Sequence, residues 1–288
     1  MGTTQAGGGA TVRRLLLGNQ LRRLREARGV TREEAGYSIR ASESKISRME
    51  LGRVGFKERD VADLLTLYGV EGEQERAAVL ALVRDANAGS WWHEYGDVLP
   101  AWFQNYLGLE EAAAEIRSYE VQFVHGLLQT ADYARAVITA GCHGLRAEDI
   151  ERRVEVRLRR QDLLSAERPP RLLAVLDEAA LRRPWGGPEQ MRGQLDRLLE
   201  LSELPHVRLQ VLPLGTAGLA AESGAFSVLG FAEAELADVV YLEQFTTALY
   251  VDKPAEVASY RRAMEDLQAE SLSPGRTRDL LHSVRQEL

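Results

Sequence analysis

The pattern of apolar and polar positions predicts five short helices in the first third of the chain. Leu17, Leu21 and Leu24 recur at helical spacing, with arginines largely on the other faces. Glycine follows three of the predicted helices, as expected for a C-terminal stop. The first predicted helix ends at Gly29, the second begins at Thr31, and the third runs from Ser42 to Gly52. The fourth and fifth lie at about Lys57–Tyr68 and Glu73–Ala88.

Two of these helices carry capping signals at their start. Thr31 is followed three residues later by Glu34, which is the spacing of a capping box. Ser42 is a favourable N-cap residue, although Lys45 stands where Glu or Gln would complete a box. The sequence therefore predicts a helix, a turn and a second helix between residues 31 and 52.

Beyond a break at Gly89-Ser90 the pattern changes to a mixture of helices and short apolar runs. The runs have the length and the flanking residues of strands, which predicts a sheet of about four or five strands. The predicted strands are Arg171–Leu176, Val207–Leu212, Ala225–Phe231, Val239–Phe245 and Ala248–Val251, and the predicted helices lie at about 108–118, 130–140, 147–166, 188–203, 254–270 and 274–287.

These patterns predict more than one domain in the 288 residues. Residues 1–14 begin with a Gly-rich run and are expected to form a disordered tail. Residues 15–88 are expected to form an all-α helix-turn-helix domain. Residues 89–288 are expected to form an α+β C-terminal domain.

Charge is distributed unevenly between these regions. The net charge of −7 by itself argues against a nucleic-acid partner. Residues 1–60, however, contain 13 Lys and Arg against 7 Asp and Glu, and the remainder contains 23 against 36. A basic head on an acidic body indicates that only the head approaches a polyanion. Surface charge also fluctuates along ordinary chains, so charge alone does not decide the partner.

Composition also bears on the compartment in which the protein acts. The sequence contains no run of 18 apolar residues that could span a membrane, and the first thirty residues lack the apolar stretch of a signal peptide. The single cysteine, Cys142, excludes an internal disulfide framework and suits a reducing compartment. We therefore expect a cytoplasmic, nucleoid-associated protein with no membrane partner.

The segment between residues 31 and 52 has the features that a helix-turn-helix requires. Gly36 provides a small residue where the two helices cross, and Ile39, Ile46 and Met49 are apolar positions that can lock them together. Such a unit holds its second helix outward so that the helix can enter the major groove.

This segment resembles the helix-turn-helix of xenobiotic-response-element-type regulators, which share a lambda-repressor-like fold of five helices. The resemblance covers roughly residues 15–85. It departs from the family at Arg40, which stands at the turn position usually held by Gly, and at Leu51, which replaces a usual Asn. An arginine at that position must adopt a left-handed conformation, at a cost of roughly 1 kcal/mol, or the turn must differ. The residues that carry the resemblance are Thr31, Glu33, Glu34, Gly36, Ile39, Ser42, Ile46, Ser47, Arg48, Glu50 and Gly52.

The resemblance implies DNA contacts at particular positions. The first residues of the second helix would face base edges, and Arg48, one turn on, would reach a guanine edge or a phosphate. Arg32, at the start of the preceding helix, would contact a phosphate. The expected DNA-binding residues are Arg32, Ser42, Glu43, Ser44, Lys45, Ser47 and Arg48.

The second domain resembles the C-terminal domain that many actinobacterial regulators of this class carry. Several phrases match in order, and they lie at residues 91–110, 116–137, 157–164, 176–187 and 239–254. The resemblance implies a domain of uncharacterised activity that senses a signal or binds a partner protein. It transfers no catalytic residue.

No arrangement of catalytic or metal-binding residues stands out in the sequence. The five histidines are scattered, and Cys142-His143 alone makes a poor metal site. Asp177 and Glu178 are adjacent carboxylates that point apart on an extended segment, which favours capping over acid–base catalysis. We expect no enzyme activity, no metal and no cofactor.

An aromatic cluster at residues 91–106 has two interpretations. The simpler one is that it packs the joint between the domains. The alternative is that it forms one wall of a small-molecule pocket, with polar groups supplied by the next helix. The residues of such a pocket would be Trp92, Trp102, Gln129, Asp132 and Tyr133.

The sequence as a whole predicts a sequence-specific transcriptional regulator that binds double-stranded DNA as a homodimer. Its C-terminal domain would dimerise, bind a small partner protein or sense a small-molecule effector. A second interpretation is an antitoxin-like or scaffold member of a two-protein module, in which DNA binding is autoregulatory. A third is an enzyme activity in the C-terminal domain.

Overall fold

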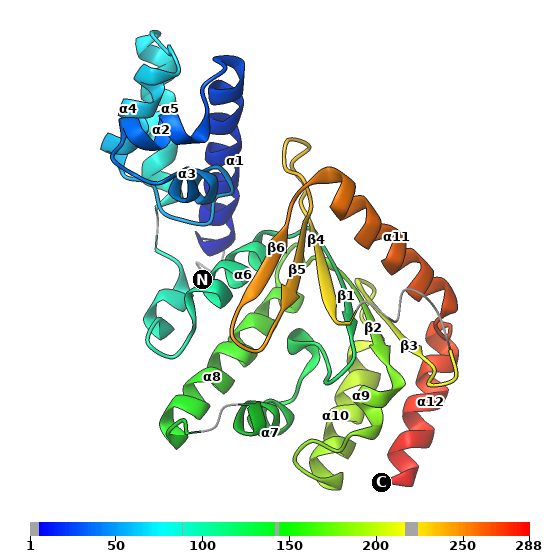
Figure 1. The fold of residues 1–288 in the computed structure, drawn as a ribbon. Coiled ribbons are helices and arrows are strands. Elements are labelled where there is room, and N and C mark those ends of the chain that lie inside the picture. The colour runs from blue at the N-terminus through cyan, green and yellow to red at the C-terminus, as the bar shows by residue number, and fades with distance from the viewer. Residues whose placement is uncertain (1–5, 88, 142–143, 217–223) are drawn as a thin grey trace. The chain divides into compact units, whose positions relative to one another are not determined.

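A computed structural model describes residues 6–87, 89–141, 144–216 and 224–288 (Figure 1). The chain divides into two compact units. The first comprises residues 1–93, 107–112 and 233–236, and the second comprises residues 94–106, 113–232 and 237–288. The predicted division at 88/89 is a single cut in the chain, whereas two short later segments group with the first unit.

The first unit contains the predicted helices. Its α1 begins well before the expected start, because residues 6–14 are helical and Thr11 and Leu15 are buried. This helix corrects the expected tail of residues 1–14, of which 1–5 lie outside the described residues. The helices are α1 (Ala6–Ala27), α2 (Arg32–Ser38), α3 (Glu43–Glu50), α4 (Glu58–Leu67) and α5 (Glu73–Ala86).

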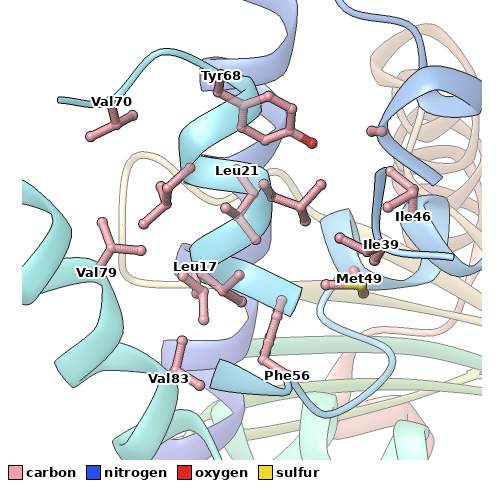
Figure 2. Close-up of a cluster of buried hydrophobic side chains, with 14 of the residues drawn as sticks. Leu17, Leu21, Ile39, Ile46, Met49, Phe56, Tyr68, Val70, Val79 and Val83 are labelled. Atoms are coloured by element: carbon pink, nitrogen blue, oxygen red, sulfur yellow. The ribbon is translucent and has the colours of Figure 1, made fainter. Parts of the chain in front are cut away.

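These helices share one hydrophobic core, which Figure 2 shows. Leu17 and Leu21 of α1 and Ile46 and Met49 of α3 are at most 1% exposed. Burial of each such side chain contributes about 1.5–3 kcal/mol. At Gly18 the two helices approach so closely that a Cβ atom would lie 2.5 Å from the carbonyl oxygen of Met49. The outward face of α3 is therefore held by a tightly packed inward face.

The second unit is built on a six-stranded mixed sheet in the order β3-β2-β1-β4-β5-β6. The first three strands are mutually parallel, and β1 also pairs antiparallel with β4, which begins an antiparallel meander. The strands are β1 (Glu115–Glu120), β2 (Arg171–Asp177), β3 (Val207–Leu212), β4 (Phe226–Gly230), β5 (Val239–Glu243) and β6 (Ala248–Val251).

Helices connect the parallel strands and complete the unit. Val257, Met264 and Leu267 of α11 pack against a sheet face that includes Tyr119 and Val175, and Figure 1 shows α11 lying along the sheet. The helices of the second unit are α7 (Ala131–Gly141), α8 (Ala147–Arg160), α9 (Glu178–Arg182), α10 (Pro188–Leu201), α11 (Pro254–Glu270) and α12 (Pro274–Glu287), with 3₁₀ turns at Gly126–Leu128 and Gln161–Ser165. Helix α6 (Ala101–Ala112) and the 3₁₀ turn at Trp91–Tyr95 are divided between the two units.

The expected fold class is confirmed, because an all-helical region precedes a region of mixed helices and strands. The main correction concerns the helix expected at 108–118. There α6 ends at Ala112, and β1 follows as a central strand of the sheet. Ile116, Ser118 and Tyr119 are all buried within a short run of otherwise charged residues, so neither an apolar run nor a strict alternation marks the strand.

Candidate nucleic-acid interface

The starts of α2 and α3 are fixed by their caps. The Thr31 hydroxyl accepts a hydrogen bond from the Glu34 N–H at 3.1 Å, and the Thr31 N–H donates to the Glu34 carboxylate at 2.7 Å. The bond from the Thr31 N–H, followed by one from the Thr31 hydroxyl to the same carboxylate at 2.9 Å, holds the pKa of Glu34 below its usual range. The Ser42 hydroxyl accepts from the Lys45 N–H at 3.3 Å. Both predicted caps are confirmed.

The turn between the two helices needs a glycine at one position and lacks one at another. A Cβ atom on Gly36 would lie 2.7 Å from the carbonyl oxygen of Ala41, so the small residue expected there is required. Arg40 has a φ of 54°. The left-handed alternative foreseen for this arginine is therefore the one that the chain adopts.

The outward face of α3 carries four of the expected DNA-binding side chains. Glu43, Ser44 and Arg48 are exposed and Ser47 is half-buried. The Arg48 side chain lies along α3, because its Nε donates a hydrogen bond to the Ser44 carbonyl oxygen of the preceding turn at 3.4 Å. A short helix with a packed inner face and a polar outer face of this kind has the form of a major-groove reader.

Lys45, which was expected to face base edges, forms an ion pair within the domain. Its ammonium group donates to the Asp60 carboxylate of α4 at 2.7 Å, and the two side chains are only 32% and 15% exposed. A partly buried charge of this kind is held by its partner more firmly than a surface pair is. Lys45 therefore joins α3 to α4 in this structure.

Arg32, which was expected to contact a phosphate, also forms an ion pair within the domain. Its Nε donates to Glu50 at 2.9 Å, and the Glu50 side chain is only 2% exposed. The same carboxylate accepts from Arg25 of α1 at 2.5 Å and 3.3 Å. This network, Arg25–Glu50–Arg32, ties the end of α1 and the start of α2 to the end of α3.

Sequence reasoning missed the structural part that Glu50 plays. The signal was present, because Glu50 follows Ile46 by four residues and Met49 by one and so falls on the buried side of a helix. A carboxylate at such a position needs cationic partners, and Arg25 is one of the arginines of α1 that were placed largely on outer faces.

Two of the expected pocket residues in the second unit support the backbone. The Gln129 side chain donates to the Val124 carbonyl oxygen at 2.6 Å and accepts from Arg157 at 2.9 Å. The Tyr133 hydroxyl accepts from the Val124 N–H at 3.1 Å. Burial raises the pKa of Tyr133 to about 12. Both side chains therefore hold the segment before the Gly126–Leu128 turn.

Of the other three expected pocket residues, one lies in α7 and two belong to the aromatic cluster. Asp132 is 70% exposed and forms a surface ion pair with Arg135. Trp92 groups with the first unit, whereas Trp102 groups with the second. The two tryptophans therefore belong to different units, and the five-residue pocket stays a prediction.

The adjacent carboxylates of the second unit have structural partners. Asp177 caps α9 by accepting from the Ala179 N–H at 2.8 Å, and it also accepts from the Tyr119 hydroxyl at 3.2 Å. Glu178 accepts from Arg182 and from the Leu214 N–H. Asp177 therefore has the expected capping role, whereas Glu178 pairs with an arginine of its own helix.

Within the described parts of the chain, no group of three His, Cys, Asp or Glu side chains could hold a metal ion. Cys142-His143 lies outside those parts. None of the described helices combines the length and the apolar character needed to cross a membrane.

Comparison with known proteins identifies two regions. Residues 16–79 match a family described as a helix-turn-helix domain. Residues 103–283 match a family described as a domain of unknown function (DUF5753). No curated protein matches the chain, and no solved structure does. The helix-turn-helix match includes α2, α3 and the turn between them.

Proposed function

The chain belongs to the DUF5753 family and carries a helix-turn-helix domain before that region, and from this premise we propose that it is a sequence-specific transcriptional regulator of the xenobiotic-response-element type. The observation that carries the proposal is the outward face of α3. It presents Glu43, Ser44 and Arg48 to solvent from a helix whose other side is locked in the core.

The proposed contacts follow from this face. Glu43 and Ser44 read base edges from the first turn of α3, with Ser42 and Ser47 beside them. Arg48 reaches a guanine edge or a phosphate. Lys45 and Arg32 support the reading helix through their carboxylate partners, which is a change from the roles that the sequence implied.

For the second unit we propose association and signal response. Helix-turn-helix proteins commonly bind two half-sites about 34 Å apart as dimers, and a paired body raises the effective concentration of the second head. A small-molecule effector or partner protein would act by favouring one of two arrangements. We propose no enzymatic role, and a protein of this kind acts in the cytoplasm on the nucleoid.

Selection of DNA from a random library by the purified full-length protein tests the proposal. We expect an enriched motif with two half-sites. Arg48→Ala should cost about 1–3 kcal/mol of discrimination between this motif and random DNA if Arg48 makes a bidentate base contact. Arg23→Ala, which removes an exposed arginine from α1, is the matched control and should leave discrimination unchanged.

The alternatives predict other results from the same preparation. Absence of any enriched sequence would contradict the proposal. Sedimentation of the full-length chain as a monomer, both free and on the selected DNA, would remove the dimer from it. A stoichiometric small protein that co-purifies from the native host would favour the two-protein module.

A further inference from the structure

The turn between α2 and α3 retains a backbone strain that the neighbouring helices avoid. Among the described residues, Arg40 is the only one other than glycine with a positive φ. A left-handed conformation costs an L-residue roughly 1–2 kcal/mol. Strain of this kind persists where the surrounding structure imposes it, and it gathers at functional positions.

The other helix ends of the first unit make the comparison direct. In α2 the Ala41 N–H donates to the Gly36 carbonyl oxygen at 2.8 Å and the Arg40 N–H donates to that of Tyr37 at 3.1 Å. Helices α1, α3 and α4 end with the same pair of hydrogen bonds, and there the left-handed residue is glycine each time: Gly29, Gly52 and Gly69. Of these four helix ends, the one that leads into α3 carries an arginine at this position.

The Arg40 side chain is also available for a ligand. It is exposed, and the described residues provide it with no hydrogen bond or ion pair. The two nearby cations expected to meet DNA, Arg32 and Lys45, are held by carboxylates within the domain. The first turn of α3 meanwhile begins with the acidic Glu43, which by itself repels a phosphate.

We propose that Arg40 contacts a DNA phosphate beside the start of α3 and that it fixes the position of the reading helix on the duplex. The inference rests on the proposed function, because it names a contact within the same interface. A guanidinium group binds phosphate oxygens through charge-assisted hydrogen bonds, and phosphate contacts set register without reading sequence. The contact accounts for an arginine at a position whose backbone favours glycine.

The test uses the full-length protein, the duplex selected from the random library and a scrambled duplex of equal length. Loss of one phosphate contact reduces the salt slope of log affinity by about 0.9, which corresponds to roughly a fivefold loss of affinity at 0.15 M salt. Arg40→Gly should show both effects on the two duplexes alike. Arg40→Lys should retain the slope, and so should the control Arg23→Ala, which removes the same charge from α1.

The possible outcomes separate the Arg40 contact from the proposed function. An unchanged salt slope in Arg40→Gly would overturn the contact while leaving the regulator intact. A loss confined to the selected duplex would also overturn it, since it would show base readout. Failure of the wild-type chain to bind either duplex would overturn the proposed function itself. Thermal unfolding of each variant shows that a lost affinity is not a lost fold.

Discussion

Replacement of Glu50 by glutamine should destabilise the helix-turn-helix more than any surface substitution would. The carboxylate is 2% exposed and lies between Arg25 and Arg32. Glutamine keeps the size and one acceptor oxygen but removes the charge, and it places an amide N–H₂ next to guanidinium donors. Arg25, whose side chain is only 9% exposed, then remains buried without its main counter-charge.

The contacts that Arg25 and Arg32 keep place the expected loss of stability near the lower end of the range for a broken buried ion pair. Removal of one partner from a buried ion pair costs about 3–5 kcal/mol. Arg25 retains the Val30 carbonyl oxygen at 2.9 Å and the Glu26 carboxylate at 3.3 Å, and Arg32, at 33% exposure, can turn to solvent. We therefore expect a loss of about 3 kcal/mol, which is roughly a 150-fold rise in the opening constant.

Hydrogen-exchange mass spectrometry of the full-length chain measures this loss locally, in peptides from α1, α2 and α3. Glu26→Gln is the matched control, because Glu26 pairs with the same arginine but is 51% exposed. Exposed pairs contribute about 0–1 kcal/mol. A Glu50→Gln variant that loses no more protection than Glu26→Gln would refute the idea that a buried network holds the two helices.

Three further predictions concern the same unit. Arg40→Gly should be more stable than Arg40→Ala by about 1 kcal/mol, because only glycine relieves the left-handed strain; equal thermal stability of the two variants would show that the backbone at this position is not strained. Because the pKa of Glu34 is lowered in the folded chain, its carboxylate stabilises the fold at pH values above the ordinary Glu pKa of about 4.3. This stabilisation is lost as the pH falls through the lowered pKa. The difference in melting temperature between wild type and Glu34→Gln should therefore vanish in acid, and a pH-independent difference would contradict the ionic cap. Gly36→Val should unfold the turn, since even a Cβ atom clashes with Ala41; a native circular dichroism spectrum and normal melting would contradict this.

Local signals predicted the helix-turn-helix well. The caps at Thr31 and Ser42 and the left-handed Arg40 depend on residues within about four positions of each other, so the sequence contains the whole cause. The contacts of Arg32 and Lys45 do not. Each meets a carboxylate on another helix, and no periodicity within one helix specifies such a partner.

The second unit shows the same limit on a larger scale. Strands β2 to β6 are marked by their own apolar residues, and each was expected close to its place. Strand β1 forms by pairing with β2 and β4 on either side of it, and its charged residues give it no apolar pattern that would predict a strand. The contacts of Gln129 and Tyr133 show the same limit, because both side chains bind the backbone of Val124, a partner that no local pattern specifies.

The central place of β1 bears on how the chain acquires its structure during synthesis. Its parallel partner β2 follows only after two helices, and its antiparallel partner β4 follows after β3. A nascent chain therefore holds β1 with both edges unpaired while most of the second unit is still to be made, and such long-range pairing is slow and exposed to aggregation. Helices α1 to α5 share one core, and all of them are made before β1. We expect a folded reading head on the ribosome well before the sheet can close.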